Sequence, residues 1–171
     1  MIETPHLILR PHTLEDYEGM TAMFGDPDFF RLSGISPQSR EEVWHRLLRY
    51  TGHWTVFGWG LFAIIDKTSG QFIGETGLAD FHRGLGDTFD PFPEAAWALM
   101  PSVQGKGYAL EAVTAAHAWF DANRPQRTVC IIDPINKPSQ KVAAALGYVA
   151  FGDTIYKGHK VTMYERSTRL A

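Results

Sequence analysis

The chain has 171 residues, of which 44% are hydrophobic and 20% are charged, and its formal net charge is −3 with the seven histidines counted as neutral. This length and composition suit one globular domain over residues 1–171, with a sizeable core. The acidic balance argues against a generic nucleic-acid binder, which usually carries a basic excess. Cys130 is the single cysteine, so no internal disulfide is available, and its place in an apolar run predicts a small buried hydrophobe.

The N-terminal residues carry no basic region followed by an apolar core, so they do not resemble a secretory signal. No apolar run reaches the roughly 18 residues that a membrane span needs. We therefore expect a cytoplasmic protein without a membrane partner. The histidines lack the close spacing typical of zinc ligands, so we expect no metal.

The first part of the chain predicts one strand followed by two helices. Residues 7–10 alternate between apolar and polar and indicate the strand. Thr13 is a suitable N-cap for a helix that runs to about Phe24. Ser39 precedes two glutamates and opens a second helix that runs to about Tyr50.

Three strands follow, and a long irregular loop separates the last two. Residues 60–66 and 71–81 indicate a hairpin joined by the turn at 67–70. The glycine- and proline-rich segment 83–93 predicts the loop, and loops of this length in compact domains are often functional. Residues 94–100 indicate the next strand, which Pro101 ends.

The last part alternates between helices and strands. Clustered early strands and later alternation together predict an α/β fold with a mixed sheet. The predicted elements are a helix over Tyr108–Asn123, a strand over Arg127–Asp133, a helix over Ser139–Leu146 ending at Gly147, and strands over 148–152 and 160–167.

The most informative segment is the glycine-rich turn at residues 104–109, QGKGYA, which leaves a strand and enters a helix. The first amides of a helix lack intrahelical acceptors, and the dipole is positive there, so such a turn suits a phosphate or pyrophosphate. Lys106 is not followed by Ser or Thr, and position 110 is Leu, so neither the P-loop nor the dinucleotide fingerprint is present. The alternative is that the glycines only allow a tight turn into the helix and that no phosphate binds there.

This turn matches the Q/R-x-x-G-x-G/A signature of the GNAT acyltransferase superfamily, and the chain resembles the branch that acetylates ribosomal-protein N-termini. The resemblance covers nearly the whole chain, and its fold would be an α/β fold with a mixed, splayed central sheet of about six to seven strands and helices on both faces. The matching segments are ETPHLILRPHTLEDYEGM at the start, IGETGL at 73–78, Glu94–Pro101, NKPS at 136–139 and ALGY at 145–148.

The resemblance implies that acetyl-CoA is the donor and that no metal is required. The pantetheine arm would lie between the strands at 94–100 and 127–133. The thioester carbonyl would be polarised by an N–H of Leu99 or Met100. The remaining residues implied to hold the cofactor are Gln104, Gly105, Lys106, Gly107, Tyr108 and Ala109 around the pyrophosphate, and Asn136 and Ser139 near the thioester.

One position departs from the family pattern. Many members carry a tyrosine as general acid four residues before the glycine that ends the last helix, and here that position is Ala143. In the ribosomal-protein branch the serine of N-x-x-S is a candidate for this role, which Ser139 fits. Its alternative role is that of a helix N-cap, because Pro138 and Ser139 stand at a predicted helix start.

Acetyl transfer to an amine needs a group that accepts the amine's proton. Glu94 begins the fourth strand of the family fold and is the preferred base, acting directly or through a water. Two alternatives to this role are that Glu94 is an exposed carboxylate at the strand end, or that its charge only attracts the amine. Glu75, which is able to face solvent, and His82 are the next candidates.

The resemblance thus implies an acetyl-CoA-dependent N-acetyltransferase that moves the acetyl group directly from the thioester to a primary amine. The amine is either a protein N-terminus or that of a small molecule. The alternative function is a non-catalytic acyl-CoA-binding sensor or regulatory module, which would keep the turn but lack a usable base or acid. We expect a monomer or homodimer.

Overall fold

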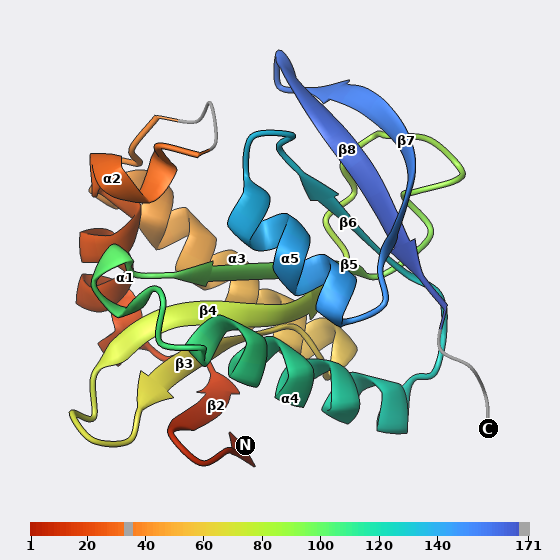
Figure 1. Ribbon diagram of the computed structural model, residues 1–171. Coiled ribbons are helices and arrows are strands. Elements are labelled where there is room, and N and C mark those ends of the chain that lie inside the picture. Colours follow the sequence, from red (N-terminus) through yellow and green to blue (C-terminus); the bar gives the residue numbers. More distant parts are fainter. Residues whose placement is uncertain (33–35, 168–171) are drawn as a thin grey trace.

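The computed structural model describes residues 1–32 and 36–167. Within them, one eight-stranded sheet has the order β1-β2-β3-β4-β5-β6-β8-β7 (Figure 1). The strands are β1 (Ile2–Glu3), β2 (Leu7–Pro11), β3 (Leu61–Asp66), β4 (Phe72–Ala79), β5 (Glu94–Leu99), β6 (Thr128–Ile132), β7 (Val149–Tyr156) and β8 (His159–Arg166). The helices are η1 (Leu14–Asp16), α1 (Tyr17–Phe24), α2 (Pro27–Phe30), α3 (Arg40–Phe57), η2 (Pro101–Val103), α4 (Tyr108–Asn123) and α5 (Lys137–Ala145).

The predicted α/β fold with a mixed sheet is confirmed. Neighbouring strands pair antiparallel except β5 and β6, which run parallel because the α4 crossover joins them. The strand β1 has only two residues and brings the sheet beyond the expected six or seven. Among the described residues, no helix is long and apolar enough to cross a membrane.

Helix α3 begins where the sequence predicts and ends later. The Ser39 side chain accepts from the Glu42 amide, and Glu42 in turn accepts from the Ser39 amide, which forms a complete capping box. The helix continues seven residues past Tyr50, to Phe57, and ends at Gly58 in the left-handed region with φ 71°. Gly52 is the only glycine inside this helix, which contains no proline, and a single glycine is tolerated within a helix.

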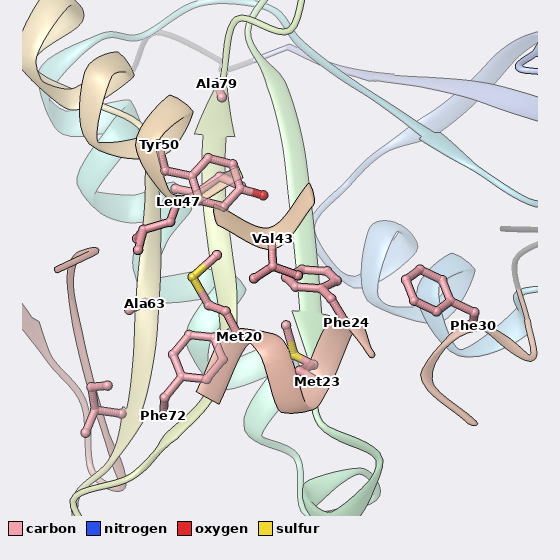
Figure 2. Packing of buried hydrophobic residues seen from close by; sticks show 12 residues of the cluster. Met20, Met23, Phe24, Phe30, Val43, Leu47, Tyr50, Ala63, Phe72 and Ala79 are labelled. Atoms are coloured by element: carbon pink, nitrogen blue, oxygen red, sulfur yellow. The ribbon is translucent and has the colours of Figure 1, made fainter. Parts of the chain in front are cut away.

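Hydrophobic side chains fill both faces of the sheet. Figure 1 shows α4 crossing one face, with α3 behind the other. Figure 2 shows the α1–α3 side, where sulfur and aromatic side chains of α1 and α3 pack on β3 and β4. The buried residues there include Met20, Met23, Phe24, Val43, Leu47, Tyr50, Ala63 and Phe72. On the α4 side they include Leu7, Leu9, Phe62, Ile64, Ala112 and Ala116.

A β-bulge interrupts the β3–β4 ladder. Ile64 pairs with Gly74 and Ile65 with Phe72, so Ile73 is an extra residue in β4. Phe72 packs on the α1–α3 side, whereas Ile73 packs on the α4 side. A Cβ at Gly74 would lie 2.3 Å from the Ala98 carbonyl oxygen, so only glycine lets the bulged strand lie this close to β5.

A buried hydrogen-bond chain links α4 to the far part of the sheet. His117 Nδ1 lies 2.8 Å from the Val113 carbonyl oxygen, which can only accept, so Nδ1 carries the proton. Nε2 is then the acceptor for the Tyr148 hydroxyl at 3.0 Å, and Thr128 Oγ1 lies 2.8 Å from that hydroxyl. Burial lowers the pKa of His117 to about 4, so the ring is neutral in the folded protein.

This histidine should make stability fall in mild acid. Its unfolded pKa is about 6.5, so between pH 6.5 and about 4 the unfolded chain binds a proton that the folded chain does not. The free energy of unfolding should therefore decrease as pH falls through that window. By pH 4.5 the loss attributable to His117 should be about 2–3 kcal/mol, from the linkage of about 1.4 kcal/mol per pH unit.

Urea unfolding of the wild type and of His117→Gln between pH 7 and pH 4.5 measures this term. The other titrating groups are common to both proteins, so the difference between their slopes isolates His117. Parallel curves for the two proteins would contradict the assignment.

Candidate functional site

The site begins where β5 and β6 separate. They share a single ladder position, Glu94 with Val129, where the Val129 amide donates to the Pro93 carbonyl at 3.0 Å. Beyond this point the two strands splay apart, and a cavity of about 260 Å³ lies between them. Its polar lining comes from β5, β6, the start of α5, the β7–β8 hairpin and the loop before β5: Arg83, Glu94, Asp133, Asn136, Ser139, Tyr156, Lys157 and His159.

The splay exposes alternate backbone groups of β5. The Met100 amide donates to the Ile73 carbonyl at 2.9 Å, so it points toward β4. Because backbone groups alternate in an antiparallel ladder, the Leu99 amide points to the opposite side, toward the splay. The expectation that either amide is free to polarise the thioester carbonyl is therefore wrong for Met100. The Leu99 amide is still a candidate for this role. The Gln104 side chain also donates to the Leu99 carbonyl at 3.3 Å and ties the turn to the end of β5.

The glycine-rich turn has the geometry of an anion-binding helix start. Gly105 and Gly107 have φ of 80° and 81°, a region that side chains other than glycine rarely adopt. Gly107 is the N-cap of α4 and offers no side chain to the first amides of the helix. The first bond of α4 runs from the Glu111 amide to the Gly107 carbonyl, so the amides at 108–110 precede it.

The surroundings of this turn suit a pyrophosphate. Nothing lies within 4 Å of a Cβ built at Gly105 or Gly107, so a ligand can approach the backbone from outside. Lys106 is exposed beside the turn, with its ammonium 6.0 Å from the Tyr108 ring centre. Tyr108 and Ala109 form the first turn of the helix, where the dipole favours an anion.

Asn136, not Ser139, caps α5. The Asn136 side chain accepts from the Ser139 amide at 3.1 Å, and the helix begins at Lys137 with Pro138 in its first turn. The expectation of Ser139 as N-cap is therefore wrong. Its hydroxyl oxygen instead accepts from Trp97 Nε1 at 3.3 Å, which leaves the hydroxyl proton available for donation.

Glu94 is buried at the closed end of the splay, with 3% of its surface exposed, so the alternative of an exposed carboxylate is wrong. Arg83 Nε donates to its Oε2 at 2.5 Å. Burial raises the pKa of Glu94 above its ordinary value, and Arg83 opposes that rise. The result is a desolvated carboxylate beside the cavity.

Glu75 and His82, the other two candidates for the general base, lie outside the cavity. Glu75 is buried, contrary to the expectation that it is able to face solvent, and accepts from the Tyr50 hydroxyl at 2.6 Å. Arg46 and His12 each lie 3.7 Å from it, and these neighbours together hold its pKa below the ordinary value. The His82 side chain is 82% exposed and pairs with Asp80. Neither Glu75 nor His82 lines the cavity.

Several cavity residues were not predicted from sequence, among them Arg83, Trp97 and Tyr156. Arg83 lies in the irregular loop, Trp97 had no assigned role, and Tyr156 belongs to a part of β7 beyond the predicted strand. The length and irregularity of the loop were the available signal for Arg83. Cys130 is 1% exposed and its pKa is raised well above the ordinary value by burial, as expected for a buried hydrophobe. Residues 1–32 and 36–167 hold no cluster of three metal-ligating side chains.

Comparison with known proteins identifies the family. Residues 6–149 match the acetyltransferase (GNAT) domain family. The chain belongs to this family. It is also 32% identical to a solved GnaT-family acetyltransferase from Bordetella pertussis, with a TM-score of 0.87 over 97% of this chain and 98% of the other.

Two more distant structures share the GNAT fold. A ribosomal-protein-S5-alanine acetyltransferase from Vibrio fischeri is 20% identical, with a TM-score of 0.79 over 99% and 97% of the two chains. A GNAT phosphinothricin acetyltransferase from Sinorhizobium meliloti, solved with AcCoA, is 19% identical, with a TM-score of 0.71 over 94% and 87%. Family membership makes the protein a GNAT-type N-acetyltransferase that takes its acetyl group from acetyl-CoA.

Gly107→Asp should abolish acetyl-CoA binding while the fold survives. The new carboxylate would lie beside the amides at 108–110 and repel the pyrophosphate. Asp tolerates the left-handed region better than most residues, so the strain should be modest. Calorimetric titration with acetyl-CoA measures the affinity.

Gly58→Asp is the matched control, because Gly58 has φ 71°, has nothing within 4 Å of an added Cβ, and lies away from the turn at the end of α3. Equal affinity for Gly107→Asp and Gly58→Asp would refute the pyrophosphate site.

Proposed function

We propose that the protein transfers the acetyl group directly to a primary amine, of a peptide N-terminus or a small molecule, with Glu94 as general base and Ser139 assisting the leaving thiolate. The observation that carries this proposal is that both side chains line one cavity from opposite faces of the sheet. Ala96 and Ala98, which alternate with Glu94, pack on the α1–α3 side. Trp97, which contacts Ser139, packs on the α5 side.

This arrangement gives the donor a defined place. The amides at 108–110, with Gln104–Gly107 before them, would hold the pyrophosphate. The Leu99 amide would face the acyl carbonyl, while Asn136 and Ser139 border the thioester end of the cavity. Acetyl-CoA supplies an activated acyl thioester, and the chain orients it and excludes water.

The base has to accept a proton from the ammonium or from the attacking amine. An amine with a pKa near 8–10 is mostly protonated at neutral pH, so removal of its proton favours attack. Glu94 lies at the cavity wall with a pKa raised by burial, which makes its carboxylate a better proton acceptor than an exposed glutamate. It would accept the proton directly or through a water.

Ser139 supports departure of the thiolate. The Trp97 indole N–H donates to the Ser139 oxygen, so the serine proton is directed away from Trp97. Ser139 also stands in the first turn of α5, where the positive end of the dipole favours a developing anion. A thiol with a pKa near 8.5 needs only modest help near neutral pH.

The acceptor is tested by acetyl-CoA turnover across a panel of amines: peptides with different N-terminal residues, polyamines, amino acids and aminoglycosides. Release of free thiol above the hydrolysis background identifies the acceptor class. No acceleration by any amine would refute direct transfer to a primary amine.

Glu94→Gln should lower kcat/KM for the true amine by about 10²-fold or more, because it keeps the shape and removes the base. Acetyl-CoA affinity should not change. In the wild type, the acidic limb of kcat/KM should reflect a group with a pKa above the ordinary glutamate value, with the rate falling as pH falls through it.

Glu75→Gln is the matched control, since Glu75 is an equally buried sheet carboxylate that does not line the cavity. Its acidic limb should match the wild type. A rise in KM alone for Glu94→Gln would mean that Glu94 binds the cationic amine and another group accepts the proton.

Ser139→Ala should lower kcat by about 10²-fold or less, with little change in acetyl-CoA affinity or melting temperature. Stability should be retained because the cap belongs to Asn136. Asn136→Ala should instead cost about 1 kcal/mol of stability. A lower melting temperature with normal kcat for Ser139→Ala would contradict the catalytic role.

A further inference from the structure

Arg83 is held rigidly beside the candidate base. Its guanidinium carbon lies 4.7 Å from the Phe81 ring centre and 4.8 Å from that of Tyr156, so the group contacts the faces of two aromatic rings. Its side chain is 19% exposed. These contacts restrict the guanidinium plane and set the direction in which Nε points.

That direction is toward one oxygen of Glu94. Nε donates to Oε2 at 2.5 Å, and this is the only hydrogen bond of the Glu94 carboxylate within the described chain. The other oxygen, Oε1, keeps its lone pairs for a group in the cavity that Glu94 lines. The ion pair therefore divides the carboxylate into an anchored oxygen and an available one.

Among the groups around Glu94, Arg83 is the one that favours its carboxylate form. Burial and the nearby Asp90 both favour the neutral acid, whereas Arg83 favours the carboxylate. On β6, the Cys130 thiol packs on the opposite face of the sheet, and burial together with the charge of Glu94 disfavours its anion. Tyr156 on β7 contacts Arg83 through its ring. Without Arg83, a carboxylate in these surroundings would have no compensating charge.

We infer that Arg83 is the positioning residue of the base: it pairs with the Glu94 carboxylate and holds Oε2, so that Oε1 is presented to the acceptor amine. This inference rests on the proposed function of Glu94. During the reaction the proton would move from the amine nitrogen to Oε1, while the Nε–Oε2 bond stays in place. The loop at 83–93 would thereby belong to the active site through its first residue.

Three variants test the inference. Arg83→Met removes the charge and keeps a long apolar side chain beside the two rings. Arg83→Lys keeps a positive charge but lacks the Nε–H group that donates to Oε2. Arg49→Met is the matched control, since Arg49 lies 5.7 Å from the same Phe81 ring, is exposed, and makes no ion pair in the described chain.

The first readout needs no turnover. The Glu94 carboxyl is titrated by NMR with ¹³C-labelled glutamate and identified as the resonance absent from Glu94→Gln. Arg83→Met should move its midpoint upward by about one unit or more, because an opposite charge lowers a carboxyl pKa by about 1–3 units. Arg83→Lys should lie between Arg83→Met and the wild type, and Arg49→Met should match the wild type.

The second readout is the pH dependence of kcat/KM with an identified amine. The acidic limb of Arg83→Met should move upward with the carboxyl midpoint, and Arg83→Lys should partly restore it. An unchanged carboxyl midpoint in both Arg83 variants overturns the inference, whatever their activity. A shifted midpoint with an unshifted limb refutes Glu94 as the base, and with it the role of Arg83. Absence of turnover with every amine affects the proposed function alone, since the carboxyl titration is still measured.

Discussion

The single point of pairing between β5 and β6 is the constraint on which the rest of the site depends. Two neighbouring parallel strands normally share a continuous ladder, but here the ladder stops at Glu94 and Val129. The strands that diverge leave backbone groups facing a cavity, and a buried polar group left unpaired costs about 1–3 kcal/mol. Such an edge is stable when a ligand or water completes it, which is what a site for an extended, amide-containing cofactor arm requires. The splay therefore lowers the stability of the sheet and leaves free the backbone groups that the proposed cofactor site would use.

The two-residue period of β5 then separates the chemical tasks. Successive side chains point to opposite faces, so Glu94 lies on the α1–α3 side and Trp97, with Ser139, on the α5 side. The proposed proton acceptor and the proposed thiolate partner thus approach one cavity from opposite directions. An amine that enters from the first side and a thiol that leaves on the second would not compete for the same group.

Much of this could be predicted from the sequence. Helix α4 has the predicted bounds, because a glycine turn precedes it and its apolar spacing is regular. The start of α5 was misplaced because Pro138 and Ser139 resemble a helix start, whereas the Asn136 side chain reaches three residues forward to cap it. The burial of Glu75 was missed because both faces of β4 are covered, so all eight residues of this strand are buried and its alternation does not separate a buried face from an exposed one. The Arg83–Glu94 pair joins an irregular loop to a strand, and no local periodicity predicts a contact of that kind.

The bulge in β4 has a consequence for how this strand can change length. Ile73 is one residue more than the partner strand requires, so its deletion would leave a regular ladder with Phe72 and Glu75 still on the α1–α3 side. A deletion between Thr76 and Ala79 would instead remove a residue that the regular ladder needs. It would turn either Glu75 or Ala79 toward α4 and place a carboxylate, or a gap, in the wrong layer. Natural variation in the length of this strand should therefore be confined to one point, which lies beside Gly74, the ladder partner of Leu99.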